Sequence, residues 1–97
     1  METPDSAEAI VIDGFQLTTY PNPFSEYTNV SFSLENASLV RFEVYNFSRQ
    51  KVISKAKEYP FGQHEMKISA DHLKAGIYVL RVRANDQVEM MKVIVQY

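Results

Sequence analysis

Apolar and polar residues alternate with a period of two along most of this chain. The alternation is clearest over positions 29–34 and again over positions 40–45. This spacing is typical of strands that bury one face. The residues expected to be buried in these two strands are Val30, Phe32, Leu34, Val40, Phe42 and Val44. A short polar connection, Glu35 to Ser38, predicts a hairpin between them.

Later segments follow the same rule, some of them less evenly. Positions 49–58 place Val52, Ser54 and Ala56 on one face and Lys51, Ile53, Lys55 and Lys57 on the other. We expect these lysines to form a solvated face that protects a sheet edge. The remaining alternations place His64, Met66 and Ile68 on one face, Tyr78, Leu80 and Val82 inward, and a final strand over Gln87 to Gln96.

Turn-forming residues separate these segments. Pro60 and Gly62 interrupt one connection, Asn85 and Asp86 turn another, and Ala70 to Leu73 predicts a short helical turn. Strands of this length with frequent turns predict an all-β fold, an immunoglobulin-like antiparallel β-sandwich of about seven strands.

Composition sets the size and excludes several functions. The 97 residues form one domain, because two cores would each be too small to be stable. We expect residues 1–14 to be an acidic linker, with Ile10 to Ile12 able to pair as a short strand, and residues 15–97 to be the domain. The net charge of −2 argues against nucleic acid as a partner.

No group of residues predicts catalysis or a cofactor. The chain has no cysteine, which removes disulfides, zinc–thiolate sites and thiol chemistry. His64 and His72 are the only histidines, and sequence proximity to Glu65 and Asp71 does not make a metal site. Ser69, Asp71 and His72 lack the elbow and oxyanion loop of a hydrolase. We therefore expect no enzyme activity, no cofactor and no small-molecule substrate.

Three short signals remain, and the first is Tyr20-Pro21-Asn22-Pro23-Phe24. Each proline fixes its own φ and extends the residue before it. This element predicts a rigid corner, which Phe24 anchors to the core. The second signal runs from Leu73 to Tyr78. Gly76 there predicts either a positive φ or a close backbone approach, and the hydroxyl of an inward Tyr78 requires a partner.

The third signal is the final strand. Met91, Val93 and Val95 are expected to face the core, whereas Val88, Met90 and Ile94 make the other face apolar too, interrupted by Lys92. Such a strand is either covered on both faces or offers one face to a partner. A free edge there would also allow a dimer by strand pairing.

In this order the three signals resemble the type A C-terminal sorting domain of the type IX (Por) secretion system. The similarity covers about Leu17 to Gln96. The opening motif of that family corresponds to Pro21, Asn22 and Pro23, its glycine-x-histidine turn to Gly62 and His64, and its leucine-x-x-glycine-x-tyrosine element to Leu73, Gly76 and Tyr78. Its terminal strand corresponds to Lys92, Val93, Ile94 and Val95. Asn46 replaces the usual aspartate, and Arg49 stands where a turn glycine is usual, which predicts a differently built turn.

The resemblance implies a secretion signal that follows a cargo protein. The domain would direct the cargo through the outer-membrane translocon with its shuttle proteins. A sortase peptidase would then cut within Met1 to Phe15 and attach the cargo to the cell surface. The candidate recognition residues are Gly76, Tyr78, Lys92, Val93, Ile94 and Val95, and Pro21, Asn22 and Pro23 mark the start of the domain.

A second interpretation is a β-sandwich module that binds carbohydrate or mediates protein adhesion. Such modules usually expose a planar strip of aromatic side chains. The candidates for exposure here are scattered along the chain: Tyr20, Tyr27, Tyr45, Tyr59 and Tyr97. A small enzyme, the third interpretation, has almost no support.

Overall fold

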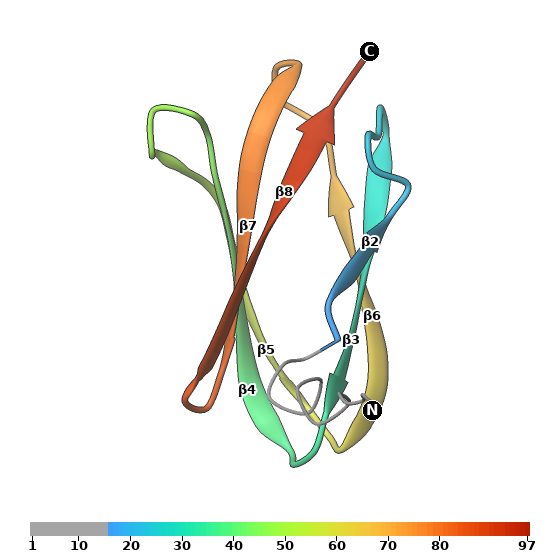
Figure 1. The fold of residues 1–97 in the computed structure, drawn as a ribbon, viewed down its shortest axis with the longest axis vertical. Helices are drawn as coiled ribbons and strands as arrows, with labels where there is room; N and C mark the ends of the chain where they lie inside the picture. The colour runs from blue at the N-terminus through green and yellow to red at the C-terminus, as the bar shows by residue number, and fades with distance from the viewer. Residues whose placement is uncertain (1–15) are drawn as a thin grey trace, which may run out of the picture.

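Two antiparallel sheets face each other in the computed structural model, which describes residues 16–97 (Figure 1). The smaller sheet has the order β2-β3-β6 and the larger has the order β5-β4-β7-β8. The strands are β2 (Thr18–Tyr20), β3 (Tyr27–Leu34), β4 (Ser38–Tyr45), β5 (Lys51–Tyr59), β6 (Gly62–Ser69), β7 (Gly76–Ala84) and β8 (Gln87–Val95). The predicted β-sandwich is confirmed.

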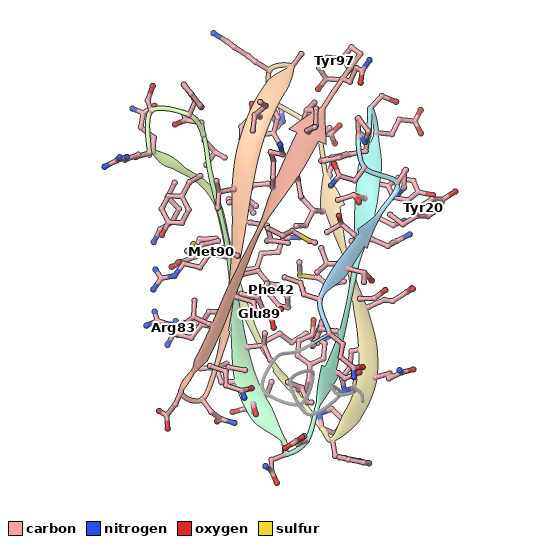
Figure 2. The ribbon with its side chains drawn as sticks, viewed as in Figure 1. Tyr20, Phe42, Arg83, Glu89, Met90 and Tyr97 are labelled. Carbon is pink, nitrogen blue, oxygen red and sulfur yellow. The ribbon has the colours of Figure 1, made fainter. Side chains whose placement is uncertain are left out.

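The core lies between the sheets and contains the residues that the period-two pattern predicted. Val30, Phe32 and Leu34 of β3 are buried, as are Val40, Phe42 and Val44 of β4. Tyr78, Leu80 and Val82 of β7 and Val93 and Val95 of β8 complete the facing layer. Phe42 points into this space, whereas Met90 and Arg83 project from the outer face of the larger sheet (Figure 2).

The prediction for β5 needs a correction at Lys51. Ile53, Lys55 and Lys57 lie opposite Val44, Phe42 and Val40, so these three share the inner face of the larger sheet. A β-bulge at Val44/Tyr45 shifts the register, and Lys51 lies opposite Tyr45 instead. Its ammonium is 3.3 Å from the Glu43 carboxylate on the outer face. β5 is the sheet edge, and its inward lysines remain exposed, as expected for edge protection.

The segment Ala70 to Leu73, before β7, forms a β-turn and not the short helical turn that the sequence predicted. The Leu73 amide donates to the Ala70 carbonyl at 2.9 Å, and His72 has a φ of +69°. A positive φ at the third residue is typical of a β-turn and stops a helix from propagating. Residues 16–97 contain no apolar helix of membrane-spanning length.

Candidate functional site

Asn22 joins the proline motif to the final strand. Its Nδ2 donates to the Lys92 carbonyl at 3.0 Å and to Thr19 Oγ1 at 3.1 Å. Its Oδ1 accepts from the Ile94 amide at 2.9 Å. An amide side chain offers both a donor and an acceptor, as a peptide group does. Asn22 therefore takes the place of a neighbouring strand along this part of β8.

Phe24 continues this pairing by two residues. Its amide donates to the Ile94 carbonyl at 2.9 Å, and its carbonyl accepts from the Gln96 amide at 2.9 Å. This contact is a parallel bridge to Val95, and the Phe24 ring is buried in the core as predicted. β8 ends its sheet, as the sequence suggested, but its edge at residues 92–96 is already covered. Within residues 16–97, the pairing that Asn22 and Phe24 provide does not extend to the stretch from Gln87 to Met91.

The proline motif is itself tied to the smaller sheet. The peptide bonds before Pro21 and Pro23 are both cis. The Pro21 carbonyl accepts from Thr28 Oγ1 at 2.6 Å, and Thr28 is fully buried. Because its buried hydroxyl requires a partner, this bond fixes the motif against β3. The motif therefore connects the two sheets across one end of the sandwich.

The second signal, Leu73 to Tyr78, leads into β7, which pairs with the other side of the final strand. Gly76 lies opposite Val95, and Tyr78 lies opposite Val93. Gly76 has a φ of +157°, a conformation that L-residues rarely adopt, whereas a side chain there would meet no atom within 4 Å. Of the two alternatives, positive φ is right and close backbone approach is wrong. The Tyr78 hydroxyl donates to the Lys74 carbonyl at 2.6 Å, which supplies the expected partner.

Tyr97, after the end of β8, hydrogen-bonds to the turn before β7. Its hydroxyl lies 2.7 Å from the Leu73 carbonyl and 3.1 Å from the Ala70 carbonyl, although the residue is 71% exposed. Sequence reasoning placed Tyr97 among candidate ligand-binding aromatics and missed this role. We call residues 92–97 with Asn22, Phe24, Gly76 and Tyr78 the final-strand cluster. It brings all three sequence signals to one end of the sandwich (Figure 1).

The predicted recognition residues divide between core and surface. Tyr78, Val93 and Val95 are buried, so they can act only by supporting the fold. Lys92 is exposed, and Gly76 and Ile94 are partly exposed. A partner that meets the folded domain at this end would therefore contact Lys92 and Ile94 rather than the valines.

The variant Asn22→Asp is expected to destabilise the domain by about 1–2 kcal/mol, the worth of one or two hydrogen bonds in a partly exposed setting. Aspartate keeps the acceptor for the Ile94 amide but places an oxygen against the Lys92 carbonyl. Urea denaturation measures the change, with Asn36→Asp as the control because Asn36 lies in an exposed turn. Equal stabilities of the two variants would contradict the bridging role of Asn22.

The Glu43 carboxylate, on the outer face of the larger sheet, contacts two cations and a tyrosine hydroxyl. The Tyr45 hydroxyl donates to Glu43 Oε1 at 2.9 Å, Arg81 lies 3.4 Å away, and Lys51 contacts the other oxygen. The Tyr45 hydrogen bond and the two cations lower the pKa of Glu43 against the opposing effect of partial burial. Glu43 is therefore ionised at neutral pH, with its charge already balanced.

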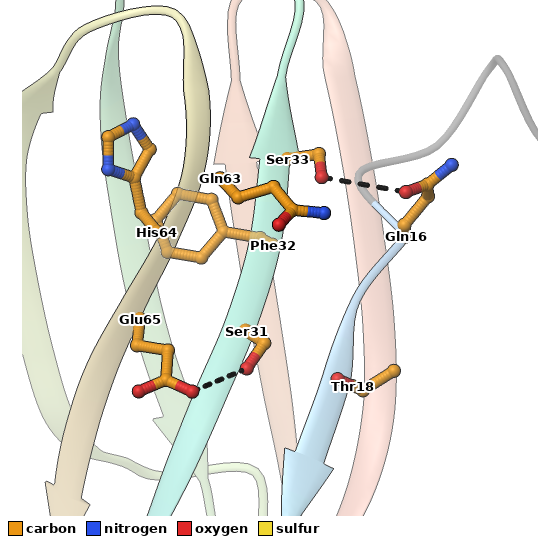
Figure 3. A pocket seen from close by; sticks show the side chains of 8 residues that line it. All are labelled: Gln16, Thr18, Ser31, Phe32, Ser33, Gln63, His64 and Glu65. Carbon is orange, nitrogen blue, oxygen red and sulfur yellow. Dashed lines mark hydrogen bonds between the residues drawn. The ribbon is translucent and has the colours of Figure 1, made fainter.

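A polar depression of about 550 Å³ lies beside β3 and β6 and includes His64 (Figure 3). Ser31 donates to Glu65 Oε2 at 3.3 Å, and Ser33 donates to Gln16 Oε1 at 3.5 Å. The His64 ring instead contacts the Pro60 carbonyl at 2.7 Å and packs against Phe32 and Tyr59. These side chains are occupied in structural contacts, and the described residues contain no cluster of potential metal ligands.

The five tyrosines that the sequence offered as exposed aromatics do not form the planar strip of a binding module. Tyr59 is buried, so its expected exposure is wrong, and burial raises the pKa of its hydroxyl. Tyr20 and Tyr97 are exposed, but one belongs to the proline motif and the other is bonded to the Ala70–Leu73 turn. Tyr20 and Tyr27 lie on strands of the smaller sheet and Tyr45 on the larger sheet, so these side chains do not share one strand face.

Comparison with protein-family models matches residues 18–96 to the secretion system C-terminal sorting domain. The chain belongs to this family. The resemblance to type IX (Por) sorting domains is thereby confirmed over nearly all of the described residues. No curated protein matches the chain. The sorting domain is a secretion signal that acts with the type IX machinery, and the family is not itself catalytic.

The two departures of this sorting domain from the family pattern lie in one turn. The Asn46 side chain accepts from the amides of Ser48 and Gln50, both at 2.9 Å, so it keeps the turn-forming role of aspartate. Arg49 has a φ of +68°, the left-handed conformation that glycine adopts most easily. An arginine therefore occupies a conformation that favours glycine, and the expectation that the turn is built differently from that of the family stays a prediction.

Proposed function

We propose that this sorting domain directs a cargo fused ahead of it through the type IX outer-membrane translocon and is then removed by a sortase. The cargo is thereby attached to the cell surface or secreted. The observation that supports this function best is the convergence of the three family signals on one strand, residues 92–97. Because all three signals meet in the final-strand cluster, it is our candidate for the part of the folded domain that the export machinery recognises.

The domain acts as the substrate of the sortase, so it requires no catalytic residue of its own. The expected cleavage region, Met1 to Phe15, and the expected linker over residues 1–14, including the strand at Ile10 to Ile12, lie outside the described residues. The translocon and its shuttle proteins would meet the folded domain from residue 16 onward. Within the final-strand cluster, Lys92, Ile94 and Gly76 offer the accessible contacts.

A reporter fused ahead of all 97 residues tests this sequence of events. In a cell with an intact type IX system, the reporter should reach the surface without the domain. Mass spectrometry of the released fragment should place the cut between Met1 and Phe15. In a strain that lacks the sortase, the reporter should still leave the periplasm but keep the domain. A cut beyond Phe15, or no cut in either strain, would contradict the proposed processing.

A further inference from the structure

The outer face of the larger sheet carries an apolar depression that the final-strand cluster does not use. Tyr45, Val79, Val88 and Met90 line it, and Arg49 and Arg81 border it, around a volume of about 540 Å³. Met90 is 66% exposed and projects away from the core (Figure 2). An exposed apolar surface of this kind in a small soluble domain is typical of an interaction site, and tyrosine, methionine and arginine are enriched at protein interfaces.

Cross-strand register gives this face a strong charge bias. Partners directly opposite one another share a face. Three successive rows run Arg41–Arg83–Val88, then Glu43–Arg81–Met90, then Lys51–Tyr45–Val79–Lys92. The rows hold five basic side chains and one acidic side chain. Glu58 lies outside them, opposite Leu39. A chain with a net charge of −2 thus presents a distinctly positive face.

One feature of this charge bias opposes folding stability, and the arginines involved have no partner carboxylate among the described residues. Arg41 and Arg83 lie directly opposite each other, and like charges in that position repel. The one carboxylate of the rows is already balanced by Lys51 and Arg81, and neither Arg41 nor Arg83 forms an ion pair with a described carboxylate. Arg49 extends the positive border from a left-handed turn. These cations are therefore available to an external anion.

We propose that this outer-face patch binds an acidic segment of a protein of the export machinery, one that inserts an apolar side chain between Val79, Val88 and Met90. The proposal rests on the proposed function for its biological partner. The depression accommodates an anchoring side chain, and the surrounding arginines match flanking carboxylates of a partner. A flat anionic lipid surface would match the charge but would not fill the depression.

Binding is tested first with a defined probe on the 97-residue chain. The probe is acetyl-Glu-Glu-Phe-Leu-Glu-Glu-amide, and its matched control carries lysine in place of glutamate. In an NMR titration, the acidic peptide should shift the amide resonances of Val79, Val88 and Met90, and added salt should weaken the effect. No shift at millimolar peptide, or equal shifts with the lysine peptide, would overturn the proposal. Binding only to phosphatidylglycerol vesicles would overturn it in favour of a lipid surface.

Arg83→Glu separates recognition from folding. The change replaces a repulsive cross-strand pair with an attractive one, so the melting temperature should hold or rise. Affinity for the acidic peptide should nevertheless fall about fivefold, as expected for reversal of one exposed charge. Lys55→Glu, on the inner face of β5, is the control of equal charge change and should bind normally. Unchanged affinity in the Arg83 variant would overturn the assignment of the patch.

The same variant connects the patch to export. A reporter fused to the Arg83→Glu domain should accumulate in the periplasm, whereas the Lys55→Glu fusion should be exported. Normal export of the Arg83 variant would overturn the assignment of the partner to the export machinery, while the proposed function would stand. Failure of the unmodified domain to export any reporter would instead contradict the proposed function and remove the biological role of the patch.

Discussion

Replacing Phe42 with alanine is expected to lower the free energy of unfolding by about 3–5 kcal/mol, the usual cost of truncating a buried phenylalanine. The residue has no exposed surface and lies in the middle of the larger sheet, between β5 and β7. Its ring centroid is 5.5 Å from that of Phe32 and 6.2 Å from that of Tyr59, so the truncation removes contacts to both sheets. Urea denaturation of the 97-residue chain measures the loss.

Phe47→Ala is the matched control for that experiment. Phe47 is 88% exposed in the turn after β4, and its removal should change stability by no more than about 0.5 kcal/mol. A domain of this size has about 5–15 kcal/mol of stability, so the Phe42 variant should lose a large share of it. A loss below about 1 kcal/mol would mean that the Phe42 ring does not lie in the core.

Removing residues 92–97 is expected to abolish export of a fused cargo and leave it in the periplasm. The deletion takes away the strand partners of Gly76, Tyr78 and Val79 and the hydrogen-bond partners of Asn22 and Phe24. It also removes Val93 and Val95 from the core. Cell fractionation of a reporter fusion measures the result. Normal export of the truncated fusion would contradict the role of the final-strand cluster.

Two double variants separate folding from recognition in that strand. Lys92→Gln with Ile94→Thr keeps the backbone bonds to Asn22 and Phe24, so the melting temperature should change little while export falls. Val93→Ala with Val95→Ala should lower both, because these side chains are buried. If the first variant is exported normally, recognition does not occur at the outward side of residues 92 and 94.

The alternation of apolar and polar residues was sufficient to predict the sandwich, because a strand that buries one face has an apolar residue at every second position. Val30, Phe42 and Leu80 are buried because each lies on the apolar phase of its strand. The same reasoning failed at Lys51, since a β-bulge between β4 and β5 changes the phase by one residue. Nothing in the local pattern of residues 49–53 reveals that shift.

The candidate site was harder to predict because its contacts are long-range. Asn22 bonds to Lys92 and Ile94, about seventy positions later, and a proline motif alone suggests only a rigid corner. Tyr97 is exposed as expected, but its hydrogen bonds were not predicted because the carbonyls it contacts belong to a turn far away in the sequence. Order along the chain indicated three separate signals, and only the fold placed them around one strand.

Localisation of a fused reporter in paired strains tests whether this domain is a type IX sorting signal. The reporter carrying the unmodified 97 residues is expressed with and without the outer-membrane translocon, and surface exposure is measured by protease accessibility on intact cells. We expect a protease-accessible reporter in the competent strain and a protected periplasmic reporter in the strain without the translocon. The same distribution of the reporter in both strains would mean that the domain is not a type IX sorting signal.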